Sequence, residues 1–142
     1  MDSVYFKASV RFKDKNQLSY VFHGNGDKSS LWFLMGDNGQ WTYSNGATTF
    51  RFPDDTVGFE AGRWYDVEVA ADFSKGTYGA WVNGQSIGQG IPISSGNTSL
   101  AGFRILPAGT PGVGGLWVDD IYFAAKRPDH DLLAPRLLNV QA

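Results

Sequence analysis

Apolar and polar residues alternate with a period of two along most of the chain. In residues 4–13 (VYFKASVRFK), every second residue is apolar and the residues between them are mostly polar. Side chains of a strand point alternately to its two faces, so this stretch predicts a strand with one buried and one solvated face. The same pattern predicts further strands at 18–23, 31–36, 40–44, 48–52, 63–73, 77–83, 100–106 and 115–124.

The segments between these predicted strands are rich in Gly, Asn, Asp and Ser, and no segment has a helical period. Such residues are typical of tight turns. About nine or ten strands in a chain of 142 residues favour two antiparallel sheets packed face to face. The predicted fold class is therefore all-β: a two-sheet antiparallel β-sandwich of jelly-roll type.

Residues 31–43 (LWFLMGDNGQWTY) predict a hairpin with Asn38-Gly39 as its two-residue turn. The second strand has polar residues on the face away from Trp41, so the Trp41 face is predicted to be buried. Counting back from the turn places four large residues on that buried face: Trp32, Leu34, Trp41 and Tyr43. The same register leaves Leu31, Phe33 and Met35 facing outward, which conflicts with their apolar character.

Residues 62–88 (GRWYDVEVAADFSKGTYGAWVNGQSIG) contain two alternating strands around a Ser-Lys-Gly turn. If the regular apolar positions point inward, the outer face carries two tryptophans that folding does not require. Arg104 adds to this face if its neighbours Phe103 and Ile105 point to the core. The predicted outer residues are Trp64, Asp66, Glu68, Trp81, Asn83 and Arg104.

These residue types together suit a sugar ligand. The apolar C–H face of a pyranose ring stacks on an indole, and its hydroxyls pair with carboxylate, amide and guanidinium groups. Trp64 and Trp81 are therefore predicted to be stacking platforms, and the polar members of the set are predicted to orient hydroxyls.

Composition and charge limit the classes of partner that the sequence supports. The formal net charge is -2 and the basic residues are scattered, so the sequence gives no support for nucleic acid as a partner. The apolar runs are much shorter than a bilayer span, so no membrane partner is predicted either. The absence of cysteine excludes disulfides and thiolate metal sites, which is compatible with a bacterial secreted module.

Two stretches carry a family resemblance: residues 62–88 and the predicted last strand, LWVDDIYFA. They resemble the concanavalin A-like lectin and glucanase superfamily, especially laminin-G-like and carbohydrate-binding modules of bacterial extracellular enzymes. The resemblance spans most of residues 3–125 and implies glycan binding on the concave sheet face and an extracellular location. It implies no required cofactor, but acids such as Asp119 and Asp120 often help to hold a structural calcium ion in such modules. Turn capping or pairing with a basic side chain explains these two acids equally well.

Catalytic members of that superfamily suggest an alternative. Their glucanase branch has a Glu-x-Asp-x-Glu strand, whereas this chain has Trp64-Tyr65-Asp66-Val67-Glu68, in which tryptophan replaces the first acid. A glycoside hydrolase or polysaccharide lyase using Asp66 and Glu68 is therefore the second hypothesis. An adhesion or structural module that binds protein through the same face is the third.

The predicted domain covers residues 1–125, and residues 126–142 are predicted to be a tail or a linker. The end of the chain, APRLLNVQA, looks like the first strand of a following immunoglobulin-like domain, which indicates a module of a larger chain. A tail folded back through its four leucines, 132, 133, 137 and 138, is the other interpretation. The function predicted is a non-catalytic carbohydrate-binding module of an extracellular, polysaccharide-processing protein.

Overall fold

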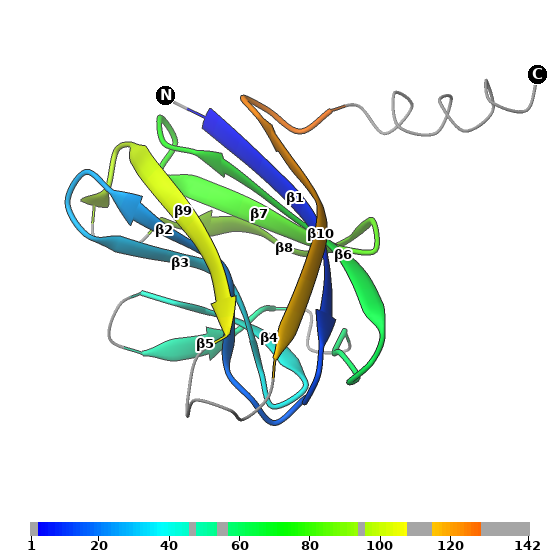
Figure 1. Ribbon diagram of the computed structural model, residues 1–142. Coiled ribbons are helices and arrows are strands. Elements are labelled where there is room, and N and C mark those ends of the chain that lie inside the picture. Colours follow the sequence, from blue (N-terminus) through cyan, green and yellow to red (C-terminus); the bar gives the residue numbers. More distant parts are fainter. Residues whose placement is uncertain (1–2, 46–47, 54–56, 94–95, 108–114, 129–142) are drawn as a thin grey trace, which may run out of the picture.

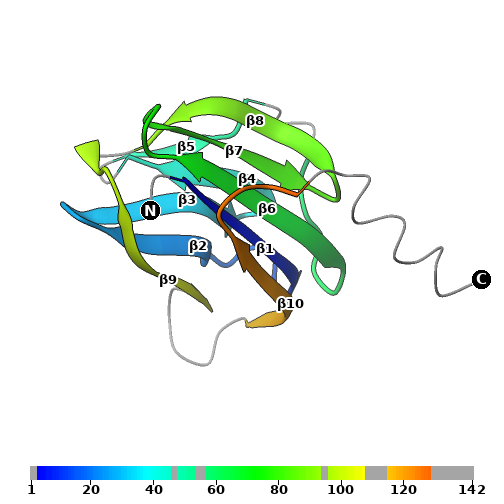
Figure 2. The same ribbon diagram turned by 90° about the horizontal axis from the view of Figure 1, so that it is seen from above.

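Two antiparallel sheets of five strands each pack face to face in the computed structural model (Figures 1 and 2). The structure describes residues 3–45, 48–53, 57–93, 96–107 and 115–128. These ranges contain no α-helix, and none of their segments is a helix able to cross a membrane. The predicted all-β sandwich is confirmed. Its strands are β1 (Ser3–Phe12), β2 (Ser19–Gly26), β3 (Ser30–Asp37), β4 (Gln40–Ser44), β5 (Thr49–Arg51), β6 (Trp64–Asp72), β7 (Thr77–Val82), β8 (Gln85–Pro92), β9 (Leu100–Pro107) and β10 (Leu116–Ala124).

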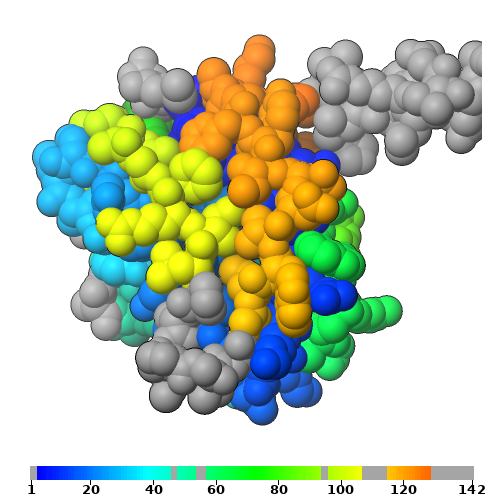
Figure 3. All heavy atoms as spheres, viewed as in Figure 1, coloured from blue at the N-terminus to red at the C-terminus, as the bar shows by residue number. Residues whose placement is uncertain are grey.

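The two sheets are built from strands that are distant in sequence. Sheet A has the order β10-β1-β6-β7-β8, and sheet B has the order β5-β4-β3-β2-β9. Figure 3 shows the edge strands β9 and β10 side by side, and the rings of Phe103 and Phe123 meet there with centroids 4.5 Å apart. The sequence pattern did not predict β8, because the glycines of QSIGQGIP and the register shifts between β7 and β8 interrupt its alternation.

The core between the sheets is aromatic. Phe6 of β1 contacts Phe22 of β2, with ring centroids 5.3 Å apart, and Phe12 stacks on Phe59 at 4.0 Å. Trp41 is buried among these rings, as predicted, and its edge meets Phe12 at 5.7 Å. Burial of side chains of this size is the main stabilising contribution in a small sandwich.

The β3–β4 hairpin confirms the predicted turn and corrects the predicted register. Asn38 and Gly39 have φ of 51° and 78°, and Gly36 pairs with Trp41. A register shift between Trp32 and Met35 then adds one residue to β3, so Trp32 pairs with Ser44. Because one extra residue reverses the alternation, the predicted burial of Trp32 is wrong. Two residues predicted to face outward, Leu31 and Phe33, are instead in the core.

Candidate functional site

The outer face of sheet A carries most of the residues predicted to bind a ligand. The pairing of β1 with both neighbours is in register from Ser9 to Arg11, and it aligns Arg11 with Trp117 on one side and Trp64 on the other. One step along the same face, Ser9 lies between Asp119 and Asp66. The inward residues of β6 are those that the alternation predicted: Tyr65, Val67, Val69 and Ala71.

Trp64, Arg11 and Trp117 form a tryptophan–arginine row across β6, β1 and β10. The guanidinium carbon of Arg11 lies 5.4 Å from the ring centre of Trp64 and 4.3 Å from that of Trp117. Both indoles remain open to solvent, with 47% and 44% of their surfaces exposed. Beside the row, the Asp66 carboxylate accepts a hydrogen bond of 2.7 Å from the Ser9 hydroxyl. The arrangement presents two stacking surfaces, with the Arg11 guanidinium between them and the Asp66 carboxylate beside the row.

Glu68 and Trp81, also predicted to bind a ligand, are covered by Arg127. Arg127 Nε donates to Glu68 Oε1 at 3.0 Å, and its guanidinium carbon lies 4.3 Å from the ring centre of Trp81. The Tyr5 hydroxyl donates to the same carboxylate oxygen at 2.5 Å. Glu68 is only 3% exposed as a result. We call Tyr5, Glu68, Trp81 and Arg127 the Glu68 cluster. Arg127 lies three residues after the end of β10, inside the predicted tail or linker.

Burial has a clear electrostatic effect on Tyr5. Desolvation raises the pKa of the Tyr5 hydroxyl well above its ordinary value, and the hydrogen bond to the Glu68 carboxylate raises it further. Tyr5 therefore stays a neutral hydrogen-bond donor at any physiological pH. This fixed donor and the Arg127 guanidinium occupy the carboxylate of Glu68.

Asn83 lies in the turn between β7 and β8 and supports the backbone there. Its φ is 51°, and its side-chain Oδ1 accepts a hydrogen bond of 2.9 Å from the Asp66 N–H. Its own N–H donates to the Asp66 carbonyl at 2.7 Å. The amide is thus used to join this turn to β6.

Arg104 does not lie on the outer face of sheet A, so its predicted grouping with Trp64 and Trp81 is wrong. β9 belongs to sheet B, where Arg104 pairs with His23 of β2. Alternation along a strand shows which residues share a face, but it does not show which sheet the strand joins. Arg104 faces outward as predicted, on the opposite side of the sandwich.

The two acids predicted to hold calcium lie at an irregular point of β10. Asp120 has φ of 51°, and its N–H donates to Asp119 Oδ1 at 2.8 Å. Within the ranges that the structure describes, no three acidic or histidine side chains gather as a metal site would require. The local hydrogen bond fits the turn interpretation, and calcium binding by Asp119 and Asp120 stays a prediction.

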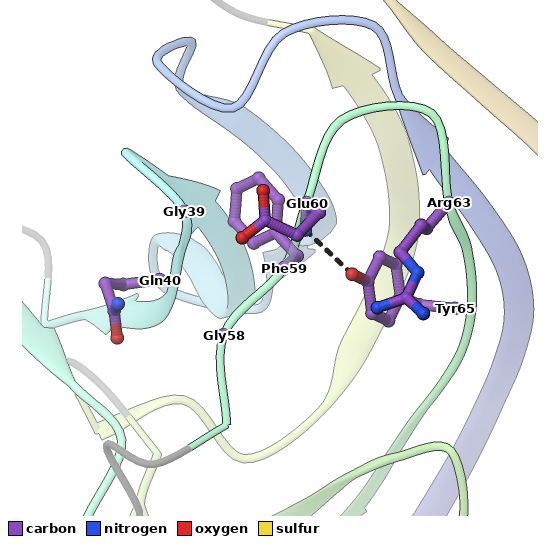
Figure 4. Close-up of a pocket in the computed structure, with 7 residues that line it drawn as sticks. All are labelled: Gly39, Gln40, Gly58, Phe59, Glu60, Arg63 and Tyr65. Atoms are coloured by element: carbon purple, nitrogen blue, oxygen red, sulfur yellow. Dashed lines mark hydrogen bonds between the residues drawn. The ribbon is translucent and has the colours of Figure 1, made fainter.

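A pocket of about 350 Å³ opens at the loop end of β6 (Figure 4). Figure 4 shows Arg63 lying beside the ring of Tyr65, with Gln40 across the pocket. The Tyr65 hydroxyl accepts a hydrogen bond of 2.7 Å from the Glu60 N–H, which holds the loop against the strand. The residues lining it are Gly39, Gln40, Gly58, Phe59, Glu60, Arg63 and Tyr65. The pocket adjoins Trp64 in sequence, and nothing in the strand pattern singled it out.

Sequence reasoning missed two members of the tryptophan–arginine row, Arg11 and Trp117. Arg11 lies at a polar-face position of the first predicted strand, whereas no face was predicted for Trp117. What the alternation lacked was the pairing of the first strand with the last, which puts them side by side.

Comparison with known proteins identifies the fold and no family. No protein-family profile matches the sequence, and no curated protein is significantly similar to it. Among solved structures, Trypanosoma rangeli sialidase is similar with a TM-score of 0.68 and 21% identity, over 98% of this chain and 23% of that chain. A second sialidase is similar with a TM-score of 0.67 and 10% identity, over 87% of this chain and 13% of that one.

A toxin domain is also similar. The binding domain of botulinum neurotoxin DC, solved in complex with rat synaptotagmin II, has a TM-score of 0.55 and 16% identity, over 99% of this chain and 36% of that one. At these identities the likeness is one of fold. The chain spans less than a quarter of either sialidase and about a third of the toxin domain.

Proposed function

We propose that this domain is a non-catalytic binding module that recognises an oligosaccharide on the outer face of sheet A. The observation that carries the proposal is the tryptophan–arginine row, with two half-exposed indoles on either side of one guanidinium. Trp64 and Trp117 stack on sugar rings, and Arg11 and Asp66 orient hydroxyls.

The dimensions of the row suit a short piece of glycan. Neighbouring strands lie about 4.8 Å apart, so two indoles separated by two strand spacings span about 10 Å. The pairing of β1 with β6 and β10 is regular around Arg11, which holds the row in register. An open platform of this kind orders few sugar units, and we expect modest affinity.

The similar structures support this proposal at a coarse level. Two of them are sialidases, and one Trypanosoma rangeli sialidase was solved in complex with sialic acid. Because this chain matches only a small part of each sialidase, we carry over a role in carbohydrate recognition and not the enzyme's reaction. The proposal includes an extracellular, multidomain parent protein.

The hydrolase or lyase alternative relies on Asp66 and Glu68. A catalytic acid or base must reach the substrate, yet the Glu68 carboxylate is buried under Arg127 and bonded to Tyr5. We therefore assign Glu68 to the structure of the face. The protein-binding alternative has a specific precedent in the toxin binding domain solved with synaptotagmin II.

Affinity electrophoresis in gels containing plant, algal and fungal polysaccharides tests the proposal. We expect one polysaccharide to retard the protein, and Trp64→Ala or Trp117→Ala to weaken binding roughly tenfold, the effect of losing about 1.4 kcal/mol. Phe50→Ala is the matched control, because Phe50 is an exposed aromatic residue of sheet B. Loss of retardation in this control alone would place the site elsewhere.

Three further arms separate the alternatives. Release of reducing ends that Glu68→Gln abolishes would support an enzyme, and no retardation by any polysaccharide would favour protein binding. A chelator, together with Asp119→Asn, tests calcium: sensitivity to both would support the predicted ion.

A further inference from the structure

The outer face of sheet B carries a second row of rings. The ring of His23 lies between those of Tyr20 and Trp32, with centroid distances of 5.5 Å and 5.3 Å. β2 and β3 both have register shifts here, which turn these three residues to the same side. Arg104 of β9 pairs with His23 and completes what we call the sheet B patch: Tyr20, His23, Trp32 and Arg104.

Arg104 is the cation of this patch, and among the described residues it forms no salt bridge. Its side chain is exposed, and the two salt bridges found among the described residues involve Lys15 and Arg127 instead. Asp37 is the acid at the far end of β3, five steps along the strand from Trp32, or about 16 Å away. An unpaired guanidinium beside aromatic rings is well suited to a planar anion, which it can bind with two parallel hydrogen bonds.

His23 adds a polar atom without a partner. Its Nε2 is buried and makes no hydrogen bond within the described chain. Burial, and then the charge of Arg104, lower the pKa of the imidazole below its ordinary value, so the ring is neutral at pH 7. The positive charge of the patch is therefore that of Arg104.

The ring row fits a sugar, and the lone cation fits a carboxylate. A stacked indole contributes apolar contact to a pyranose ring, and Arg104 lies one strand away from His23 and two strands away from Trp32. A carboxylate attached to the ring would be within reach of the guanidinium when the ring stacks. The outer face of sheet A differs, because its row has the carboxylates of Asp66 and Asp119 nearby.

We propose that the sheet B patch is a second binding site, specific for a sugar that bears a carboxylate. Trp32 stacks on the sugar ring, and Arg104 binds its carboxylate through both of its terminal nitrogens. The site is independent of the one proposed on sheet A, because the two faces point to opposite sides of the sandwich. One domain then holds two glycan segments at once.

Paired probes test this inference and distinguish two sources of the carboxylate. Trigalacturonate is compared with its methyl ester, and sialyllactose with lactose, by calorimetry and by NMR of the 142-residue chain. We expect at least one acidic member to bind at least tenfold more tightly than its neutral partner, with shifts of the Trp32 indole and His23 signals. Higher salt should weaken this binding.

Matched variants locate the site. Arg104→Gln and Trp32→Ala should each reduce acidic-sugar binding about tenfold or more, whereas Trp64→Ala should leave it unchanged. Arg51→Gln is the charge control, because Arg51 is an exposed arginine of the same sheet, four strand spacings or about 19 Å from β9. An equal loss of acidic-sugar binding in Arg51→Gln would show that the binding depends on overall charge and not on Arg104, and would overturn the inference.

The remaining outcomes are also decisive. Equal binding of an acid and its neutral partner, or no binding of any of the four probes, would overturn the acidic-sugar site and leave the sheet A proposal standing. Loss of acidic-sugar binding in Trp64→Ala would move that ligand to sheet A. Acidic-sugar binding that depends on Arg104, with no polysaccharide binding through Trp64, would support this inference and contradict the proposed function.

Discussion

The two outer faces of the sandwich differ in how they are built and in their charge. On sheet A, β1 pairs with β6 without a register shift, and with β10 it stays in register from Ser9 to Phe12 after one shift between Lys7 and Ser9. This stretch places the tryptophan–arginine row beside a second straight row that contains Asp66 and Asp119. On sheet B, register shifts bring three rings together on β2 and β3, beside Arg104 of the edge strand β9, which forms no salt bridge with any residue that the structure describes. Similar inner faces thus support two outer surfaces that differ in their charged groups: the row on sheet A has carboxylates beside its cation, and the patch on sheet B has the cation Arg104.

The Glu68 cluster makes the largest difference between the faces. Among the described residues, Glu68 of sheet A is the buried charged side chain, and Arg127, which follows the last strand, covers it. Arg127→Ala should lower the free energy of unfolding by about 2 kcal/mol, since it removes the charged hydrogen-bond partner of the Glu68 carboxylate and the side chain that covers it. Denaturant unfolding measures this loss. Lys126→Ala, at an exposed neighbouring position, should change stability by less than about 0.5 kcal/mol.

A double mutant makes this prediction specific. Glu68→Gln removes the charge that Arg127 neutralises, so the double variant should be more stable than the sum of the two single losses predicts. Strictly additive losses would show that the ion pair between Glu68 and Arg127 contributes little. Stability equal to the wild type in Arg127→Ala would show that this segment does not cover the face in solution.

The contrast also shows what the sequence could predict. β6 alternates without interruption, so its outward residues Trp64, Asp66 and Glu68 were assigned correctly to one face. The burial of Glu68 was not predictable, because the covering residue Arg127 comes 59 residues later and outside any strand. Pairing between distant strands is set by the whole topology, which local periodicity does not encode.

The predictions for sheet B were wrong for a different reason. A period-two pattern assumes one residue per step, and the register shifts in β2 and β3 break that assumption at Phe22 and near Trp32. The predicted conflict at Leu31, Phe33 and Met35 was the signal of such a bulge. Arg104 was correctly predicted to face outward, but it was grouped with the wrong sheet. The alternation of β9 does not show which of the two sheets this edge strand joins.

The tryptophan–arginine row gives a smaller, measurable effect on sheet A. Arg11→Gln removes a guanidinium that contacts two indoles, and exposed contacts of this type contribute about 0.5–1 kcal/mol each. We expect the free energy of unfolding of Arg11→Gln to fall by about 1 kcal/mol and its tryptophan fluorescence to change. Arg63→Gln, a nearby exposed arginine, is the control. The same fluorescence change in Arg63→Gln would show that Arg11 is not held between the indoles.

His23 gives the smallest effect and the most direct test of charge on sheet B. NMR titration should give its imidazole a pKa below the ordinary 6.5, and Arg104→Gln should move that pKa back toward 6.5. Arg51→Gln should leave the pKa of His23 unchanged, because Arg51 lies on β5, three strand spacings or about 14 Å from β2. An unchanged His23 pKa in Arg104→Gln would show that the guanidinium of Arg104 does not lie close to His23.

The direction of this shift also fixes how stability depends on pH. A folded pKa below the unfolded value means that the unfolded chain binds more protons as the pH falls below about 6.5. Stability should therefore fall from about pH 6.5 down to the folded pKa of His23, and no further below it on account of this residue. His23→Gln should flatten that part of the profile relative to the wild type. Because Arg104 contributes to the shift, Arg104→Gln should flatten it in part, which links the stability profile to the cation that distinguishes sheet B from sheet A.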